Sequence, residues 1–352
     1  MRVLLVKMSS LGDVVHALPA VTDAAAALGP SLELHWVVEE AFAAIPARHP
    51  AVAEVIPVAW RRWRRNLGGS RGEMRAFLRR LRSRRYDLVL DAQGLLKSAA
   101  ICALARGPAA GFARRSAREG AAALFYRTPV AVPRGQHAVD RLRQLFACAL
   151  RYPLPPSAPQ FGLTAAASAE SPRQRQCVLL HGTTWASKEW PVRFWRELAA
   201  RAAEADFEVL VPWGNDAERA RAHGIADGTA ARVLDREPLE RLTARLAAAE
   251  LVVGVDSGLT HLAAALGVPT VAVYGSTAPQ LTGVRGPRAV ALAASEPECV
   301  PCLRRECTYQ GPALTWRGAP VRPDCYASVS PERVWRASRA LVAAEADGDV
   351  GG

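Results

Sequence analysis

The sequence predicts an α/β protein with two domains, each built on a doubly wound parallel sheet. Short apolar runs typical of buried strands alternate with helical patterns through both halves of the chain, as in sheets covered by helices on both faces. The chain has 352 residues, 50% of them hydrophobic, which is enough for two ordinary cores but long for one. A stretch rich in Pro, Ser and Ala separates the halves.

Strands are expected at apolar runs that are short, rich in Val and Leu, and bounded by polar or turn-forming residues. In the first half these runs are 3–6 (VLLV), 32–38 (LELHWVV), 52–58 (VAEVIPV) and 87–92 (DLVLDA). In the second half they are 177–182 (CVLLHG), 207–213 (FEVLVPW), 251–256 (LVVGVD) and 269–275 (PTVAVYG). The two halves therefore repeat one type of architecture.

Two helical patterns frame this arrangement. The first covers 14–28, directly after the first strand, and the second covers 331–346, where Val334, Ala337, Leu341 and Val342 have helical spacing. We expect a first domain over 1–155, a linker over 156–175, a second domain over 176–330, a final helix over 331–346 and a disordered Gly-rich tail over 347–352.

The charge of the chain indicates an anionic partner. A formal net charge of +12 and a pI near 10.0 suit a nucleic acid, a membrane surface or a phosphorylated substrate. The seven cysteines are an odd number, and Lys7 and Asp13 interrupt the N-terminal apolar run, so we expect a reducing cytoplasm and no secretory signal. No unbroken apolar stretch reaches the roughly 18 residues of a membrane span.

A small polar turn follows the first expected strand. In open parallel sheets, ligands bind beyond the carboxyl ends of the strands, and Ser9, Ser10, Gly12 and Asp13 lie at such a position beside Lys7. Asp13 either caps the following helix or serves a ligand. The turn matches neither the G-x-x-x-x-G-K-[ST] nor the G-x-G-x-x-G pattern, so an ATP-hydrolase or NAD-binding interpretation loses its main support.

The second half offers a phosphate site. Asp256, Ser257 and Gly258 lie between a strand and a helix, and the free N–H groups of a helix N-terminus suit a pyrophosphate. The alternative is a capped helix without a ligand.

Two other strand ends could complete this site. Thr183 and Thr184 follow one strand, with Lys188 just beyond, and hydroxyls with a flexible ammonium suit phosphate oxygens, although a lone surface lysine is often only solvated. Glu218 follows the next strand, where a carboxylate commonly binds ribose hydroxyls. Together these residues predict a nucleotide-diphosphate pocket.

These motifs resemble those of the ADP-heptose:lipopolysaccharide heptosyltransferases. The likeness covers nearly the whole chain, in the order VLLVKMSSLGDVVHALPA, YDLVLDAQGLLKSA, HGTTWASKEWP, VPWG and VDSGLTHLAAAL, and is greatest to the branch that adds the first heptose to Kdo2-lipid A. It implies a GT-B fold, with two Rossmann-like domains facing a cleft and a final helix that crosses back to the first domain. It also implies an inverting transfer that requires no cofactor, with acceptor in the first domain and ADP-heptose in the second.

The resemblance assigns roles to individual residues. Asp13 matches the proposed catalytic base, which fits the need for one carboxylate to take the proton of the acceptor hydroxyl. Lys7 and Ser10 beside it are expected to bind the acceptor. Asp256 is expected to position donor heptose hydroxyls or its own loop, because a carboxylate repels a diphosphate. His261 matches a donor-site histidine, with a packed helix residue as the alternative. The full expected donor set is Thr183, Thr184, Lys188, Glu218, Asp256, Ser257, Gly258 and His261.

The sequence departs from the family pattern in three places. Ser257 stands where the family has threonine, which keeps the hydroxyl. Ser276 and Ala278 stand where the family tends to have proline and aspartate, so we expect this donor loop to differ from that of the family in detail. An insertion over 296–326 resembles a segment of sister heptosyltransferases.

An arginine cluster gives the positive charge a use. Arg61, Arg62, Arg64 and Arg65 surround Trp60 and Trp63. This cluster either forms a solvated face without a specific role or binds the acceptor. In the second case it binds at the cytoplasmic face of the inner membrane, where lipid A phosphates and Kdo carboxylates lie. A nucleic-acid binder could use the same arginines, but both strand-end sites would then have no function. The nearer alternative is a sister enzyme, heptosyltransferase II, which differs in its acceptor.

The insertion contains four cysteines. Cys299-x-x-Cys302 resembles the first half of a zinc site, and Cys307 and Cys325 could complete a structural, four-thiolate site. The spacing of the second pair is irregular, so reduced thiols in a surface loop are the alternative.

Overall fold

The computed structural model describes residues 1–163 and 174–348, and the chain divides into two compact units between Thr164 and Ala165. This division falls within the predicted linker 156–175, of which 164–173 lie outside the described residues. The strand that opens the second unit begins at Gln174, two residues before the predicted domain boundary.

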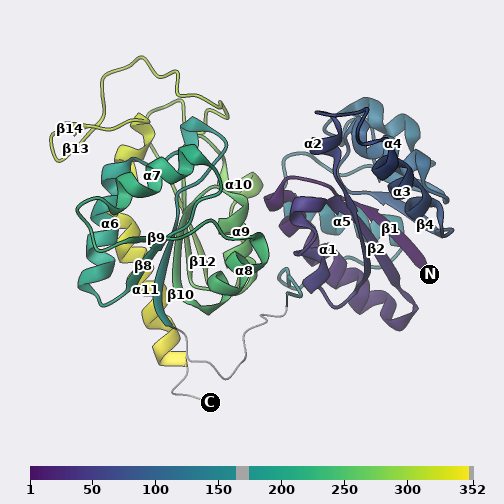
Figure 1. Ribbon diagram of the computed structural model, residues 1–352, viewed down its shortest axis with the longest axis horizontal. Helices are drawn as coiled ribbons and strands as arrows, with labels where there is room; N and C mark the ends of the chain where they lie inside the picture. The colour runs from purple at the N-terminus through teal and green to yellow at the C-terminus, as the bar shows by residue number, and fades with distance from the viewer. Residues whose placement is uncertain (164–173, 349–352) are drawn as a thin grey trace. The chain divides into compact units, whose positions relative to one another are not determined.

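The first unit contains a six-stranded parallel sheet in the order β3-β2-β1-β4-β5-β6 (Figure 1). Its central strand is fully apolar along VLLV, and Val3 pairs with Leu34 on one side and Leu88 on the other. A strand without polar residues needs cover on both faces. The strands are β1 (Arg2–Val6), β2 (Glu33–Glu39), β3 (Val52–Val58), β4 (Leu88–Asp91), β5 (Ala109–Phe112) and β6 (Thr128–Val130).

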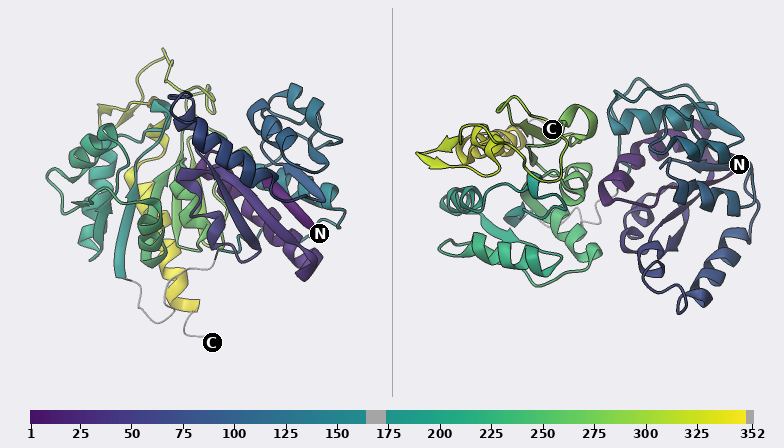
Figure 2. Two further views of the ribbon diagram at one scale, coloured as in Figure 1. Left: turned by 45° about the vertical axis from the view of Figure 1, so that its right-hand side comes forward. Right: turned by 90° about the horizontal axis from the view of Figure 1, so that it is seen from above.

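Helices supply that cover. One core joins Leu4 and Val6 of the sheet to Leu81 of α3 and Ile101 of α4, while α1 and α5 pack together on the opposite face (Figures 1 and 2). The helices are α1 (Leu11–Leu28), α2 (Trp60–Trp63), α3 (Arg71–Arg82), α4 (Leu96–Leu104) and α5 (Ala138–Leu150), with 3₁₀ turns at η1 (Gly29–Ser31), η2 (Glu40–Phe42), η3 (Pro46–Arg48) and η4 (Gly120–Phe125).

The helical segment Leu11–Ser31 is long and apolar enough to cross a membrane by length and composition alone, although the sequence predicted no such segment. Its mean hydropathy is 1.2, and 61% of the window is buried within the protein. Asp13, His16 and Asp23 interrupt its apolar residues, and its packing against α5 is that of a core helix.

The second unit repeats the same topology. Its six parallel strands have the order β12-β11-β10-β7-β8-β9, so in both sheets the first and fourth strands in the chain are central neighbours. This is the strand order of Rossmann folds. The strands are β7 (Gln174–Leu180), β8 (Glu208–Val211), β9 (Arg232–Val233), β10 (Ala249–Val255), β11 (Thr270–Tyr274) and β12 (Ala289–Ala293).

A large aromatic core lies on one face of this second sheet, where Trp190, Phe194 and Trp195 pack against Val253 and Val334. The helices are α6 (Val192–Glu204), α7 (Asp216–Ala226), α8 (Leu239–Ala248), α9 (Gly258–Ala265), α10 (Pro279–Thr282) and α11 (Pro331–Gly348). The insertion carries a small hairpin, β13 (Thr315–Trp316) and β14 (Ala319–Pro320), and 3₁₀ turns form η5 (Ala186–Lys188) and η6 (Asp324–Ser328).

Helix α11 packs on α6 and on strands β10, β11 and β12 of its own unit, and Figure 2 shows it in yellow beside that sheet. It ends at Gly348, two residues into the predicted tail, whose remaining residues 349–352 lie outside the described residues. That this helix also reaches the first domain stays a prediction.

The prediction of two doubly wound sheets is confirmed, but each sheet has two more strands than the apolar runs indicated. Strands β5, β6, β9 and β12 were not predicted. The first and last are rich in Ala, and the other two have only three and two residues, so none shows the apolar, β-branched run that marks a strand.

Candidate active site

The first candidate site lies where the strand order of the first sheet reverses. Strands β1 and β4 are neighbours there, and the polypeptide leaves them into α1 and α4, so a crevice forms between the two loops. The loop after β1 carries the predicted Lys7 and Ser10 and leads into α1 with Asp13, while the loop after β4 carries Gln93 and leads into α4 with Lys97. Topology thus brings together two motifs that are more than 80 residues apart.

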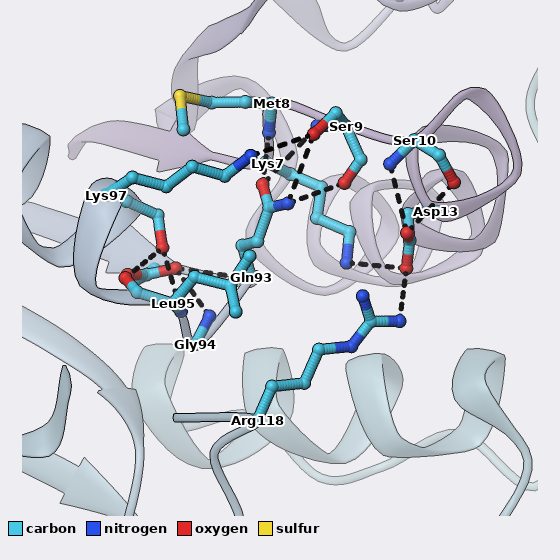
Figure 3. Close-up of polar contacts among 12 residues, drawn as sticks. Lys7, Met8, Ser9, Ser10, Asp13, Gln93, Gly94, Leu95, Lys97 and Arg118 are labelled. Atoms are coloured by element: carbon cyan, nitrogen blue, oxygen red, sulfur yellow. Dashed lines mark hydrogen bonds and ion pairs between the residues drawn. The ribbon is translucent and has the colours of Figure 1, made fainter. Parts of the chain in front are cut away.

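Asp13 lies in the first turn of α1, which begins at Leu11 rather than at the predicted residue 14. Ser10 is the N-cap residue, and its N–H and Oγ donate to Asp13 Oδ2 at 3.0 and 3.1 Å. The second oxygen faces two cations, with Lys7 Nζ at 3.3 Å and Arg118 Nη2 at 3.1 Å from Oδ1 (Figure 3). Asp13 is therefore part of a capping box and also of a charge cluster.

The cations keep this carboxyl ionised. Burial by itself raises the pKa of Asp13, but the opposing charges of Lys7 and Arg118 and the Ser10 N–H lower it by more, so the pKa lies well below its usual range. Burial conversely lowers the pKa of Lys7, although the Asp13 charge opposes this. Lys7 is enclosed, with 5% of its side chain exposed, whereas Arg118 is 56% exposed and free to contact a ligand.

Arg118, Gln93 and Lys97 are the functional candidates that sequence reasoning missed. Arg118 follows β5 in a segment without a motif, and nothing in its surroundings indicated a partner in α1. Lys97 Nζ donates to Ser9 Oγ at 3.3 Å, and Gln93 contacts Met8 and Ser9. The available signal for Gln93 and Lys97 was the family resemblance, which the stretch YDLVLDAQGLLKSA supported.

The second candidate site lies at the equivalent position of the second sheet, beyond the neighbouring strands β7 and β10. Lys188 Nζ contacts Asp256 Oδ2 at 2.7 Å, and Thr277 Oγ1 donates to the same oxygen at 2.7 Å. His261 Nε2 lies 3.3 Å from Asp256 Oδ1. Asp256 thus ties together the loops after β7 and β11 and the helix α9.

Asp256 is buried but ionised. Burial raises its pKa, while the hydrogen bond from His261 and the charge of Lys188 lower it by more, so the pKa lies below its ordinary value. Lys188 Nζ also lies 4.5 Å from the centroid of the Trp185 ring. The Lys188 ammonium is therefore held in the segment that follows β7, and 16% of the Lys188 side chain is exposed.

The N-terminus of α9 is the predicted phosphate site. Ser257 is the N-cap residue, and its Oγ accepts the Thr260 N–H at 3.4 Å. Thr260 is buried, and a Cβ on Gly254 would lie 2.2 Å from its Oγ1, so the close approach of strand and helix needs glycine there. Ser257 and Gly258 are partly exposed, as a ligand-binding helix start must be.

Glu218 approaches the same edge from α7. Its Oε2 accepts the Gly214 N–H at 2.7 Å, and a Cβ on Gly182 would lie 2.9 Å from its carboxyl carbon. The carboxylate therefore lies against the end of β7, directly before the partly buried Thr183 and the exposed Thr184. The structure thus places Glu218 beside the end of β7, while Lys188, Asp256 and His261 form one cluster beyond β7 and β10.

The arginine cluster differs from the prediction. Trp63 is buried in the core of the first unit and donates to Glu73 at 2.9 Å, so it does not face a membrane. Arg62 is held by Glu40 and Glu73 at 3.0 and 2.8 Å, because these carboxylates flank α2. Arg61 stacks on Phe42, while Arg64 and Arg65 are exposed.

The four cysteines of the predicted zinc site lie near one another but are not grouped as metal ligands. Across residues 1–163 and 174–348, no group of three or more His, Cys, Asp or Glu side chains could hold a metal ion. Cys325 is buried against Gly275, whereas Cys299 and Cys307 are exposed on the insertion. Burial, then the nearby thiols, raise the pKa of Cys325 to about 12, so its thiol is neutral.

The insertion instead supports the second site. Leu303 N–H donates to the Ser276 carbonyl at 2.8 Å, and Ser187 N–H donates to the Arg305 carbonyl at 3.0 Å. Ser187 Oγ also contacts Ser276 Oγ at 2.9 Å. These bonds hold the loop of Lys188 against the loop after β11.

Comparison with known proteins identifies the family. Residues 74–312 match glycosyltransferase family 9 (heptosyltransferase), and lipopolysaccharide heptosyltransferase 1 of Pseudomonas aeruginosa is 51% identical over 342 residues, which are 95% of this chain and 96% of the relative. The chain belongs to this heptosyltransferase family. The resemblance seen in the sequence is confirmed, and the protein is a glycosyltransferase that transfers heptose in the synthesis of the lipopolysaccharide inner core.

Solved structures agree. The E. coli heptosyltransferase WaaC with ADP has a TM-score of 0.79 and 43% identity, covering 84% of this chain and 93% of its own. The same enzyme with ADP-2-deoxy-2-fluoro heptose has a TM-score of 0.76 and 42% identity, with the same coverage. This similarity confirms the GT-B fold of the heptosyltransferase.

Proposed function

We propose that this heptosyltransferase transfers L-glycero-D-manno-heptose from ADP-heptose to Kdo2-lipid A, with inversion at the anomeric carbon. The observation that carries the mechanism is the Asp13 carboxylate, fixed by Ser10 and flanked by two cations at the switch point of the first sheet. An inverting transfer needs one group to take the acceptor proton, and Asp13 is ionised and so available as acceptor.

Arg118 gives this base a means of activation. In the free protein its guanidinium is one of two cations that lower the basicity of Asp13. An acceptor phosphate or carboxylate that binds Arg118 neutralises part of this charge, so the Asp13 pKa rises towards a value that suits a base. Lys7 remains beneath the carboxylate and holds it in place.

The donor is proposed to bind the second unit. Lys188, the two threonines after β7 and the start of α9 supply positive charge and hydrogen-bond donors for the diphosphate, and Glu218 suits the ribose hydroxyls. The same groups stabilise the negative charge of the departing ADP. His261 would hold Asp256, which positions Lys188, and we propose that catalysis requires no metal.

The acceptor is proposed to reach the first unit from the inner leaflet of the inner membrane, at its cytoplasmic face. Exposed Arg64 and Arg65, with Arg118 nearer the base, carry charge that suits lipid A phosphates and Kdo carboxylates. Arg62 already has two carboxylate partners, so we assign it to the support of α2. Arg61 is exposed, stacks on Phe42 and contributes positive charge to this surface.

The test measures ADP release from ADP-heptose with Kdo2-lipid A, with heptosyl-Kdo2-lipid A, and without acceptor. We expect stimulation by Kdo2-lipid A, since the curated relative at 51% identity is a heptosyltransferase 1. Stimulation by the heptosylated acceptor instead would favour heptosyltransferase II. A gel shift on single-stranded and duplex DNA checks the expectation that the protein binds no nucleic acid specifically.

A further inference from the structure

Gln93 occupies an unusual position beside the candidate base. It lies in the loop between β4 and α4, and only 3% of it is exposed. Its Oε1 accepts the Met8 N–H at 2.8 Å and the Ser9 N–H at 3.4 Å, and its Nε2 donates to the Ser9 carbonyl at 2.6 Å (Figure 3). The side-chain amide therefore uses both its donor and its acceptor on one short backbone segment.

This contact continues the sheet beyond its last strand pair. The Ala92 N–H donates to the Val6 carbonyl at 3.1 Å, and the Gln93 amide takes the next backbone groups, those of Met8 and Ser9. On the other side, the Glu39 N–H binds the Met8 carbonyl at 3.1 Å. The Gln93 side chain thus substitutes for a strand where the backbone of β4 has already turned away.

The backbone at Gln93 is fixed by hydrogen bonds to Asp91. Asp91 Oδ1 accepts the N–H groups of Gln93 and Gly94 at 2.8 and 3.0 Å, and the Tyr126 hydroxyl donates to Asp91 Oδ2 at 2.7 Å. Gly94 has a φ of +67°, which favours glycine and lets the loop turn at this point. Gln93 is therefore fixed on its strand before it contacts Ser9.

We propose that Gln93 is a positioning residue for Asp13. Ser9 is followed by Ser10, the N-cap residue whose N–H and hydroxyl bind the Asp13 carboxylate, so the amide that fixes Ser9 fixes the base. The proposal rests on the proposed role of Asp13. A carboxamide is needed because a glutamate cannot donate to the Ser9 carbonyl, and a methionine of similar size makes neither hydrogen bond.

A double-mutant cycle in the full chain tests this. Gln93→Met should lower kcat about 10-fold or more, because small misplacements of a base are costly, while the donor KM changes less than about twofold. In the Asp13→Asn background the same substitution should lower the residual kcat less than about twofold, since no base remains to be misplaced. An equal loss in both backgrounds would mean a general structural role and would overturn the proposal.

Controls separate positioning from folding. Gln144→Met removes a comparable amide bond on α5, from Gln144 Nε2 to Gln136 Oε1 at 2.8 Å, and should leave kcat within about twofold. If Gln93→Met does not fold, Gln93→Glu keeps the size of the side chain, and wild-type kcat in that variant would overturn the proposal. If Asp13→Asn itself keeps near-normal turnover, the base assignment fails and the proposal fails with it, an outcome distinct from equal losses.

Discussion

Replacement of Lys188 by methionine tests the donor site with the fewest side effects, since methionine can still pack on Trp185, over whose ring the ammonium lies. A charge-assisted hydrogen bond to a diphosphate contributes about 1.5–3 kcal/mol. We therefore expect Lys188→Met to lower kcat/KM for ADP-heptose roughly 10- to 150-fold, with the acceptor KM changed less than about threefold. Initial rates of ADP release, with each substrate varied in turn, measure both quantities.

The same variant has a predictable effect on stability. Lys188 is the cation 2.7 Å from the buried Asp256 carboxylate, which keeps Thr277 and His261 as partners. Because those bonds remain, we expect a loss of about 1.5–3 kcal/mol in the free energy of unfolding, less than for a buried ion left with no partner. Urea unfolding followed at neutral pH measures it.

The pH dependence of that loss follows from the Asp256 pKa, which is lowered in the folded state. A group of this kind stabilises the fold above its unfolded pKa, near 3.9, and the stabilisation is lost as the pH falls through the folded pKa. The difference between Lys188→Met and the native protein should therefore be full at pH 7 and shrink below about pH 4. An acceptor KM that rises as much as kcat/KM for the donor falls, or a stability difference that grows on acidification, would refute this reasoning. Lys188→Arg should retain most activity.

Three further outcomes are expected. Replacing Arg64 and Arg65 by serine should raise the acceptor KM and weaken its dependence on salt, and an unchanged KM would make both a solvated surface. Gly182→Ala should raise the donor KM, because the new Cβ would lie 2.9 Å from the Glu218 carboxyl carbon and displace this carboxylate. The melting temperature should change little, because the Glu218 side chain is flexible and can shift. A raised acceptor KM alone would contradict this. Protein purified without added metal should contain less than about 0.1 equivalent of zinc, and near one equivalent would restore the four-cysteine site.

The sequence predicted the strand ends better than the sheets. Runs such as VLLV and LVVGVD have only one plausible environment, a strand buried on both faces, so the loops that follow them were placed correctly. Strand β12, AVALA, lacked that signal because three alanines with one valine and one leucine also suit a helix. Once the strands are placed, the Rossmann order alone brings Asp13 near Gln93 and Lys188 near Asp256.

Side-chain partners were the part that sequence could not supply. From the sequence Arg62 was expected to be a free charge for the acceptor, because its partners, Glu40 and Glu73, lie in other elements. Arg118 reaches Asp13 from 105 residues away, which no local pattern records. Trp63 illustrates the reverse error, since an aromatic residue between arginines looked exposed but packs into the core.

The most direct test of the central claim, that Asp13 is the base of a heptosyl transfer, is the turnover of Asp13→Asn with ADP-heptose and Kdo2-lipid A. Asparagine keeps an oxygen that can accept the Ser10 N–H, now 3.0 Å from the carboxylate, so the capping contact is retained while the proton acceptor is lost. We predict a fall in kcat of about 10²-fold or more with the donor KM nearly unchanged and a lowered melting temperature, because the buried Lys7 ammonium loses its counter-charge. Turnover within about threefold of the native enzyme would contradict the account and leave Asp13 as a helix-capping residue.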